Sequence, residues 1–265
     1  MKKFKKYSDK SIFKSQLENN GWFIAEEFIQ DDIFLNDLKK SLRECFDNCQ
    51  LLREKNGVTE NNSGTVHHLI GQNPIFLDLL DGLVLEFNEV FENFFSSKYI
   101  LNAFGGNFLE KGVHSYASEI HRDVRTFSKD INLMMNTLVM FDDFTEENGA
   151  TYLLSNSHRY SEKPTKDYFY KNADRAVAKK GSVIFWNSYL WHAAGENKKN
   201  EERTSVTPMF TKCFVKPQFD YVNCFNQGDL NDRLKQVLGF NSRVPGTLED
   251  WYQPREKRFY KSDQE

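Results

Sequence analysis

The spacing of hydrophobic positions changes from helical to strand-like near Lys98. Before that residue, apolar side chains recur every three or four positions in residues 31–49 and again in the segment IFLDLLDGLVLEFNEVFENFF that follows Pro74. This periodicity predicts amphipathic helices, and acidic residues or a proline at the start of each segment favour helix N-termini there. We therefore expect one helix that ends near Cys49 and a second that either continues through Gly82 or breaks at it.

After Lys98 the apolar runs become short, which is typical of β-strands. The run at residues 131–141 (INLMMNTLVMF) is long and apolar enough for a buried central strand. Gly105-Gly106 indicates a bulge or a close approach of another segment. Several short strands with irregular connections predict an antiparallel sandwich or jelly roll. The other predicted strands lie at residues 21–25, 99–104, 182–186 and 204–210.

These patterns predict one domain over residues 1–265 that is mainly β with flanking helices. At 265 residues the chain can bury a sizeable core. We expect a helical buttress and lid at about 30–97, with a polar loop at 53–64 and part of the lid at 53–72. The jelly-roll core then covers about 98–215. A C-terminal tail covers about 216–265 and contains a short helix at 230–238.

Charge and composition narrow the class of protein. The 35 basic and 38 acidic residues nearly balance, so no electrostatic footprint favours nucleic acid or an anionic membrane. No apolar run approaches the roughly 20 residues of a membrane helix, and the basic first residues lack the apolar stretch of a secretory signal. Of the four cysteines, Cys45 and Cys49 are interpreted as two ordinary residues of one helix. We expect a cytoplasmic monomer or homodimer with no nucleic-acid or membrane partner.

Candidate chemistry begins with His121 and Asp123 in the segment SEIHRD. Alone, this pair is equally consistent with two polar residues on a strand. His192 follows an apolar strand much later in the chain, in WHAAG. Two histidines and one carboxylate match the facial triad that binds Fe(II) and leaves open positions for a cosubstrate and O₂. We therefore predict that His121, Asp123 and His192 are metal ligands and catalytic residues.

Arg203 begins the next predicted strand, with Ser205 two positions further on the same face. A guanidinium inside a barrel is costly unless an anion pairs with it. A carboxylate of a cosubstrate would do so with fork geometry. The sequence therefore predicts that Arg203 and Ser205 bind a cosubstrate.

Together these residues resemble the phytanoyl-CoA dioxygenase family of Fe(II)/2-oxoglutarate oxygenases, across roughly residues 18–215. Residues 19–24 (NNGWFI) resemble the family's opening strand, residues 148–158 (NGATYLLSNSH) its loop that usually ends Pro-Gly-Ser-His, and residues 191–197 (WHAAGEN) the segment around its distal histidine. The resemblance implies a double-stranded β-helix, which is a cupin-like jelly roll. It also implies Fe(II), 2-oxoglutarate and O₂ as cofactors.

Further roles follow only from this resemblance. Asn107 and Thr137 fall where relatives contact 2-oxoglutarate, and Phe127 falls where an aromatic borders the substrate. Two features depart from the family: Ser155-Asn156 replaces Pro-Gly, and Ala194 stands where several members have a serine near the cosubstrate. Other candidate substrate contacts are His67, His68, Gln72 and His114, whereas His158, Trp186 and Tyr189 are interpreted as structural or packing residues.

The resemblance implies hydroxylation of a small-molecule metabolite, in natural-product or cell-envelope biosynthesis. Halogenating relatives have Gly or Ala at the carboxylate position, and Asp123 therefore favours hydroxylation. Three alternatives stay open: a hydroxylase acting on a CoA ester, a non-catalytic ligand-binding jelly-roll protein, and a zinc-dependent hydrolase or isomerase. Intact His121, Asp123, His192 and Arg203 argue against the non-catalytic protein. Arg203 argues against the zinc enzyme, because it would then be an unpaired interior charge.

Overall fold

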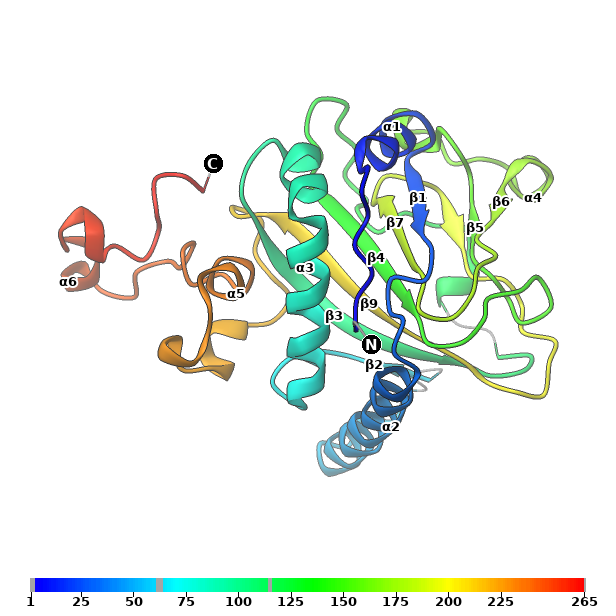
Figure 1. Ribbon diagram of the computed structural model, residues 1–265, viewed down its shortest axis with the longest axis horizontal. Coiled ribbons are helices and arrows are strands. Elements are labelled where there is room, and N and C mark those ends of the chain that lie inside the picture. Colours follow the sequence, from blue (N-terminus) through cyan, green and yellow to red (C-terminus); the bar gives the residue numbers. More distant parts are fainter. Residues whose placement is uncertain (1–2, 61–63, 114–115, 265) are drawn as a thin grey trace.

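The computed structural model describes residues 3–60, 64–113 and 116–264, and His114 therefore lies outside the described residues. Two antiparallel sheets form its centre, and helices flank them (Figure 1). The large sheet has six strands in the order β1-β7-β4-β9-β3-β2, and the small sheet has three in the order β6-β5-β8. The predicted jelly roll with flanking helices is confirmed. That the chain forms a single domain stays a prediction.

The large sheet contains the longer strands. They are β1 (Trp22–Ala25), β2 (Thr65–Val66), β3 (Tyr99–Leu109), β4 (Met134–Met140), β7 (Val183–Asn187) and β9 (Arg203–Lys212). The small sheet consists of β5 (Tyr152–Leu153), β6 (Asp174–Arg175) and β8 (His192–Ala193). The helices are α1 (Ser11–Asn20), α2 (Asp32–Lys55), α3 (Pro74–Phe95), α4 (Lys166–Asn172), α5 (Asp232–Val237) and α6 (Leu248–Trp251).

Helices cover one face of the large sheet, and the small sheet lies against the other. Helix α3 packs on β3 and β9, and α1 packs on β1 and β7 (Figure 1). Met135 and Val139 of β4 face this helical layer, whereas Leu138 and Met140 belong to the cluster between the two sheets. Because strand side chains alternate between faces, β1, β4 and β7 contribute to both cores.

The long helices differ in detail from the predicted ones. Helix α2 continues past Cys49 to Lys55, which shortens the predicted loop. Helix α3 passes through Gly82 without a break. Glycine is required there because the ring of Phe4 lies against it, and a Cβ atom would come within 2.2 Å of that ring. Among the described residues, no helix is both long and apolar enough to cross a membrane.

Strand β3 runs straight through Gly105-Gly106, so these glycines do not form a bulge. The irregularity in its pairing with β9 lies earlier, between Leu101 and Ala103. The alternative prediction, a close approach, holds for Gly106: a Cβ atom there would lie 2.4 Å from Leu42 of α2. Helix α2 thus packs directly on the backbone of β3.

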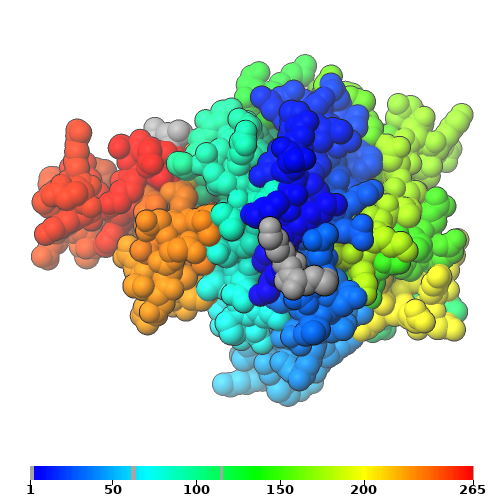
Figure 2. Space-filling model, in the orientation of Figure 1, coloured from blue at the N-terminus to red at the C-terminus, as the bar shows by residue number. Residues whose placement is uncertain are grey.

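The C-terminal segment, residues 216–264, packs at one end of the large sheet, next to β3 and α3. Helix α5 packs against β3 and α3. Figure 2 shows the last residues, in red, extending away from the main body of the molecule.

Candidate active site

Three side chains converge where the small sheet meets the loop after β3. Ligand atoms of His121, Asp123 and His192 all lie within 4.8 Å of one another. The Nε2 atoms of His121 and His192 lie 3.7 and 3.6 Å from the two carboxylate oxygens of Asp123. The two histidines also form a β-bridge, in which each backbone N–H donates to the other's carbonyl at 3.0 and 3.1 Å. This bridge joins two segments that are far apart in the sequence.

Each histidine is oriented by a backbone carbonyl. Nδ1 of His121 lies 2.7 Å from the carbonyl oxygen of Glu119, and Nδ1 of His192 lies 2.9 Å from that of Leu190. A carbonyl only accepts, so the proton of each neutral ring is on Nδ1 and the lone pair is on Nε2. Burial, together with the neighbouring His192, lowers the pKa of His121 and favours its neutral form. Both rings are therefore prepared to bind a metal ion through Nε2.

Asp123 is held by two donors from neighbouring strands. Its Oδ2 atom accepts hydrogen bonds from Asn136 Nδ2 at 2.5 Å and from Trp186 Nε1 at 3.1 Å. Asn136 and Trp186 are directly paired across β4 and β7, which brings both donors to one point. Asn136 is not among the residues predicted for the site, and Trp186 is predicted as a packing residue. The sequence carries no signal for this pairing, because β4 is apolar on both faces and its register with β7 is not marked.

Arg203 lies deep in the same region, at the start of β9. It is 4% exposed, and its guanidinium lies 4.1 Å from the ring centroid of Phe144. Nη1 donates to the carbonyl of Gly149, while Nε is buried without a hydrogen-bond partner. Within the described ranges, no carboxylate forms an ion pair with Arg203, and burial lowers its pKa to about 9. A buried cation with an unused donor is the environment that an anionic ligand would complete.

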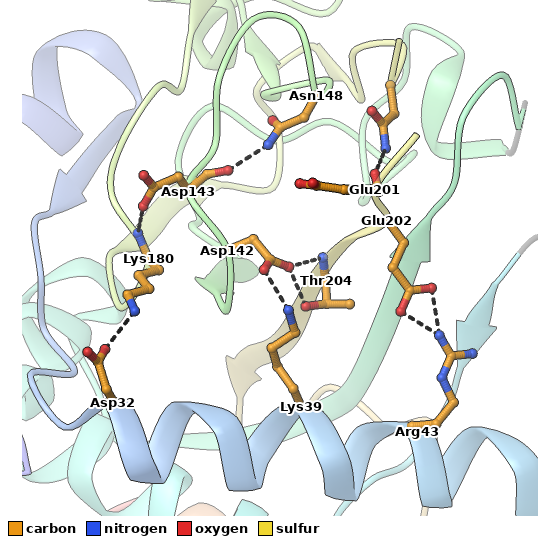
Figure 3. A network of polar contacts seen from close by, with 11 residues as sticks. Asp32, Lys39, Arg43, Asp142, Asp143, Asn148, Lys180, Glu201, Glu202 and Thr204 are labelled. Carbon is orange, nitrogen blue, oxygen red and sulfur yellow. Dashed lines mark hydrogen bonds and ion pairs between the residues drawn. The ribbon is translucent and has the colours of Figure 1, made fainter. Parts of the chain in front are cut away.

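Asp142, the acidic residue whose charge acts on Arg203, is already occupied by other partners. Its Oδ2 accepts from the backbone and the hydroxyl of Thr204 at 2.8 and 2.6 Å, and Lys39 of α2 pairs with Oδ1 at 2.6 Å (Figure 3). Arg43 on the same helix donates to both carboxylate oxygens of Glu202 (Figure 3). These contacts fasten the start of β9 to α2 and leave the Arg203 charge available.

A cavity of about 600 Å³ is lined by the three candidate ligands, by the donors Asn136 and Trp186, and by Arg203, Ser205 and Asn107. Asn107 and Ser205 are paired across β3 and β9, so both side chains point to the same side. The set of two imidazoles and one carboxylate fits Fe(II), and the unpaired guanidinium fits the distal carboxylate of 2-oxoglutarate. Ala194 also lines the cavity and offers no hydroxyl.

One predicted cosubstrate contact does not face this cavity. Thr137 is fully buried and donates its hydroxyl to the carbonyl of Pro208 at 2.9 Å. It lies on β4 in phase with Met135 and Val139, which face the helices. The assignment of Thr137 to 2-oxoglutarate is therefore wrong, because its side chain points to the helical face of β4. The preceding residue, Asn136, faces the cavity.

The predicted substrate contacts divide in a similar way. Only His67 among the described ones lines the cavity. His68 stacks on Phe219, and Gln72 donates to the carbonyls of His67 and His68, so both support the wall from outside. Phe127 packs on Tyr189 away from the cavity. Sequence analysis missed Arg53 and Tyr116 in the lining, which lie in segments that carry no motif.

Comparison with known proteins agrees with this geometry. The family described as phytanoyl-CoA dioxygenase (PhyH) matches residues 47–205, which is more than half of the chain. The chain belongs to the phytanoyl-CoA dioxygenase family. The matched region contains the three candidate ligands and Arg203. The predicted family is thereby confirmed.

Relatives of this PhyH-family chain include the uncharacterized protein Rv1501 of Mycobacterium tuberculosis, which is 34% identical over 152 residues. That match covers 56% of each chain, so the present chain spans little more than half the length of this relative. The dioxygenase cdmD of Talaromyces verruculosus is 34% identical over 85 residues, which cover 32% of this chain and 28% of cdmD.

Solved structures share the fold at low sequence identity. The non-heme alpha-ketoglutarate-dependent epimerase SnoN from nogalamycin biosynthesis superposes with a TM-score of 0.60 at 15% identity, over 85% of this chain and 92% of SnoN. AviO1 from Streptomyces viridochromogenes gives 0.57 at 16% identity, over 80% and 99%. These similarities confirm the predicted PhyH-type jelly roll.

Proposed function

We propose that the protein is an Fe(II)- and 2-oxoglutarate-dependent dioxygenase that hydroxylates a small-molecule metabolite. The observation that carries the proposal is the presence of two unlike features in one cavity. His121, Asp123 and His192 offer a metal site, and the buried Arg203 offers a site for a carboxylate. A zinc hydrolase has no use for the second feature.

The chain's own residues would prepare the metal site. His121 and His192 would bind through Nε2, because the backbone carbonyls of Glu119 and Leu190 hold the Nδ1 protons. Asp123 would bind through Oδ1, because Asn136 and Trp186 occupy Oδ2. When bound, Fe(II) supplies the coupled oxidation of 2-oxoglutarate and of a substrate C–H bond by O₂.

The cosubstrate would be held by β9 and β3. Arg203 would donate its free N–H groups to the distal carboxylate, with the carbonyl of Gly149 fixing the orientation of the guanidinium. Ser205 and Asn107 line the cavity from adjacent strands and would add hydrogen bonds. Because Arg203 and its surroundings are buried, these interactions would act in a low-dielectric environment where they are strong.

The mouth of the cavity supports a small substrate. Its described lining includes Arg53, His67 and Gln218. A single arginine there is less than the cluster of basic residues that the phosphates of CoA would need, which favours a small metabolite over a CoA ester. Asp123 fills the position at which halogenating relatives have a small residue, and this supports hydroxylation. SnoN comes from nogalamycin biosynthesis, and we extend a biosynthetic role to this chain.

Turnover of the cosubstrate tests the proposal without knowledge of the substrate. Purified protein supplied with Fe(II), 2-oxoglutarate and O₂ should form succinate slowly, and screening of metabolites should identify a compound that accelerates it. A His192→Ala variant is the control and should form none. Binding of 2-oxoglutarate with no succinate under any condition would indicate the non-catalytic alternative. Absence of 2-oxoglutarate binding would favour a hydrolase.

A further inference from the structure

Arg122 lies between two proposed metal ligands but does not face the metal site. Its side chain is buried, at 6% exposure, and is not part of the cavity lining. Its contacts lie instead with the loop at residues 154–161 and with Trp191, the residue before His192. Arg122 therefore belongs to the segment of His121 and Asp123 and contacts the segment of His192, on the side away from the cavity.

The guanidinium donates to carbonyl oxygens of one turn. Nη1 donates to Ser161 at 3.2 Å, and Nη2 donates to Ser157 at 3.1 Å and also to Tyr160. Ser157 begins a short 3₁₀ helix, Ser157–Arg159, and Tyr160 and Ser161 follow it directly, at a helix end where carbonyls lack partners within the helix. The planar fork of an arginine can reach several such oxygens at once, which a lysine cannot do.

Aromatic rings complete the environment of Arg122. Its Cζ atom lies 4.3 Å from the ring centroid of Trp191 and 5.0 Å from that of Phe127. The backbone N–H of Trp191 donates to the hydroxyl of Ser157 at 2.8 Å. Trp191 is thus fixed by the same turn that binds Arg122, and its neighbour His192 is fixed with it.

No described carboxylate forms an ion pair with Arg122, and burial lowers its pKa. A buried cation is costly when unpaired, and the carbonyls and rings offset that cost. The two residues directly before the turn that Arg122 binds depart from the family pattern. Asn156 stands at the usual glycine position with φ of 67°, in the left-handed region, and Ser155 replaces the stiffening proline.

We propose that Arg122 is a positioning residue for the metal site. It fastens the turn at residues 157–161 to Trp191 and to the His121–Asp123 segment, and it thereby sets the distance between His121 and His192. The inference rests on the proposed function, since it takes these residues as metal ligands. It adds that the spacing of the ligands depends on a cation that touches neither metal nor substrate.

Co(II) titration of the metal-free protein tests this role, because its visible absorption reports ligand geometry and needs neither 2-oxoglutarate nor turnover. Arg122→Met should weaken Co(II) binding ~10–100-fold, the usual cost of losing a group that orients metal ligands, and should change the absorption intensity. Arg122→Lys keeps the charge but loses the fork, so it should recover only part of the affinity. Arg125→Met, at an exposed neighbouring arginine, should bind Co(II) like wild type.

Stability is controlled separately. Phe91→Leu loosens the core on the helical side of the large sheet and should lower the melting temperature with no change in Co(II) affinity. If Arg122→Met does not fold, Arg122→Lys decides the question. Wild-type affinity in a folded Arg122 variant would overturn the inference and leave the proposed function standing. Normal Co(II) binding by wild type without 2-oxoglutarate binding would refute the proposed function and leave the inference about Arg122 standing. Absence of Co(II) binding in wild type would refute both the proposed function and the inference.

Discussion

Replacement of Arg203 by methionine tests two effects of its buried charge separately: the loss of stability in the ligand-free protein and the binding of 2-oxoglutarate. Burial lowers the pKa of Arg203 to about 9, and at neutral pH the side chain stays charged. Relative to the ordinary arginine value, this shift corresponds to a cost of roughly 5 kcal/mol in the ligand-free protein, taken as an upper bound. Methionine fills a similar space without the charge, so the variant is relieved of this cost.

Two lost interactions oppose the gain. The hydrogen bond from the cation to the carbonyl of Gly149 contributes about 1.5–3 kcal/mol, and the contact with the Phe144 ring contributes about 2 kcal/mol. The net change in the free energy of unfolding is then between about 0 and 1.5 kcal/mol in favour of the variant. Most substitutions of a fully buried side chain destabilise a protein, which makes this an unusual expectation.

Ligand addition should reverse the order of stability. Without O₂, with Fe(II) present and 2-oxoglutarate at about 100 times its Kd, wild type should gain about 2.7 kcal/mol from binding, and Arg203→Met should gain none. Urea denaturation with and without 2-oxoglutarate measures both quantities. The reasoning is refuted if the ligand-free variant is less stable than wild type by several kcal/mol, or if 2-oxoglutarate stabilises both proteins equally.

Three further predictions concern the core, the metal site and the pH dependence. Phe185→Ala should lower the free energy of unfolding by about 3–5 kcal/mol in urea denaturation, because the ring is fully buried against Phe23; a loss below about 1 kcal/mol, the effect of an average substitution, would contradict the packing. Trp186→Phe removes one donor to Asp123 and should weaken Fe(II) binding ~10-fold in anaerobic titration, whereas unchanged affinity would argue against this hydrogen bond. Burial lowers the pKa of His158 to about 4, so the folded state binds fewer protons than the unfolded state and stability should fall as pH drops from 6.5 toward 4. His158→Gln should flatten that dependence in melting curves, and an equally steep fall would refute the assignment.

Sequence reasoning succeeded where the chemistry itself marks the residue. His192 and Arg203 are polar groups close to apolar strands, and His121 and Asp123 became interpretable as ligands through these two partners later in the chain. The structure brings all four to one cavity. The short strands alone left an antiparallel sandwich or a jelly roll open, and the resemblance to the family narrowed this choice to the jelly roll.

The failures have separate physical causes. The segment INLMMNTLVMF is apolar on both faces because each face of β4 packs against a core, so it carries no alternation that could assign Thr137 to one side. Helix α1 was not predicted because it buries only Phe13 and Leu17. His68 and Gln72 are explained by contacts with residues distant in the sequence or by local backbone geometry, neither of which a motif records.

The most direct test of the central claim is an anaerobic titration of the protein with Fe(II) and 2-oxoglutarate, followed by visible absorption. The account predicts a weak metal-to-ligand charge-transfer band that saturates at one equivalent of each per chain and is lost when Asp123 or His192 is replaced by alanine. Well-folded wild-type protein that shows no such band would contradict the assignment of this site.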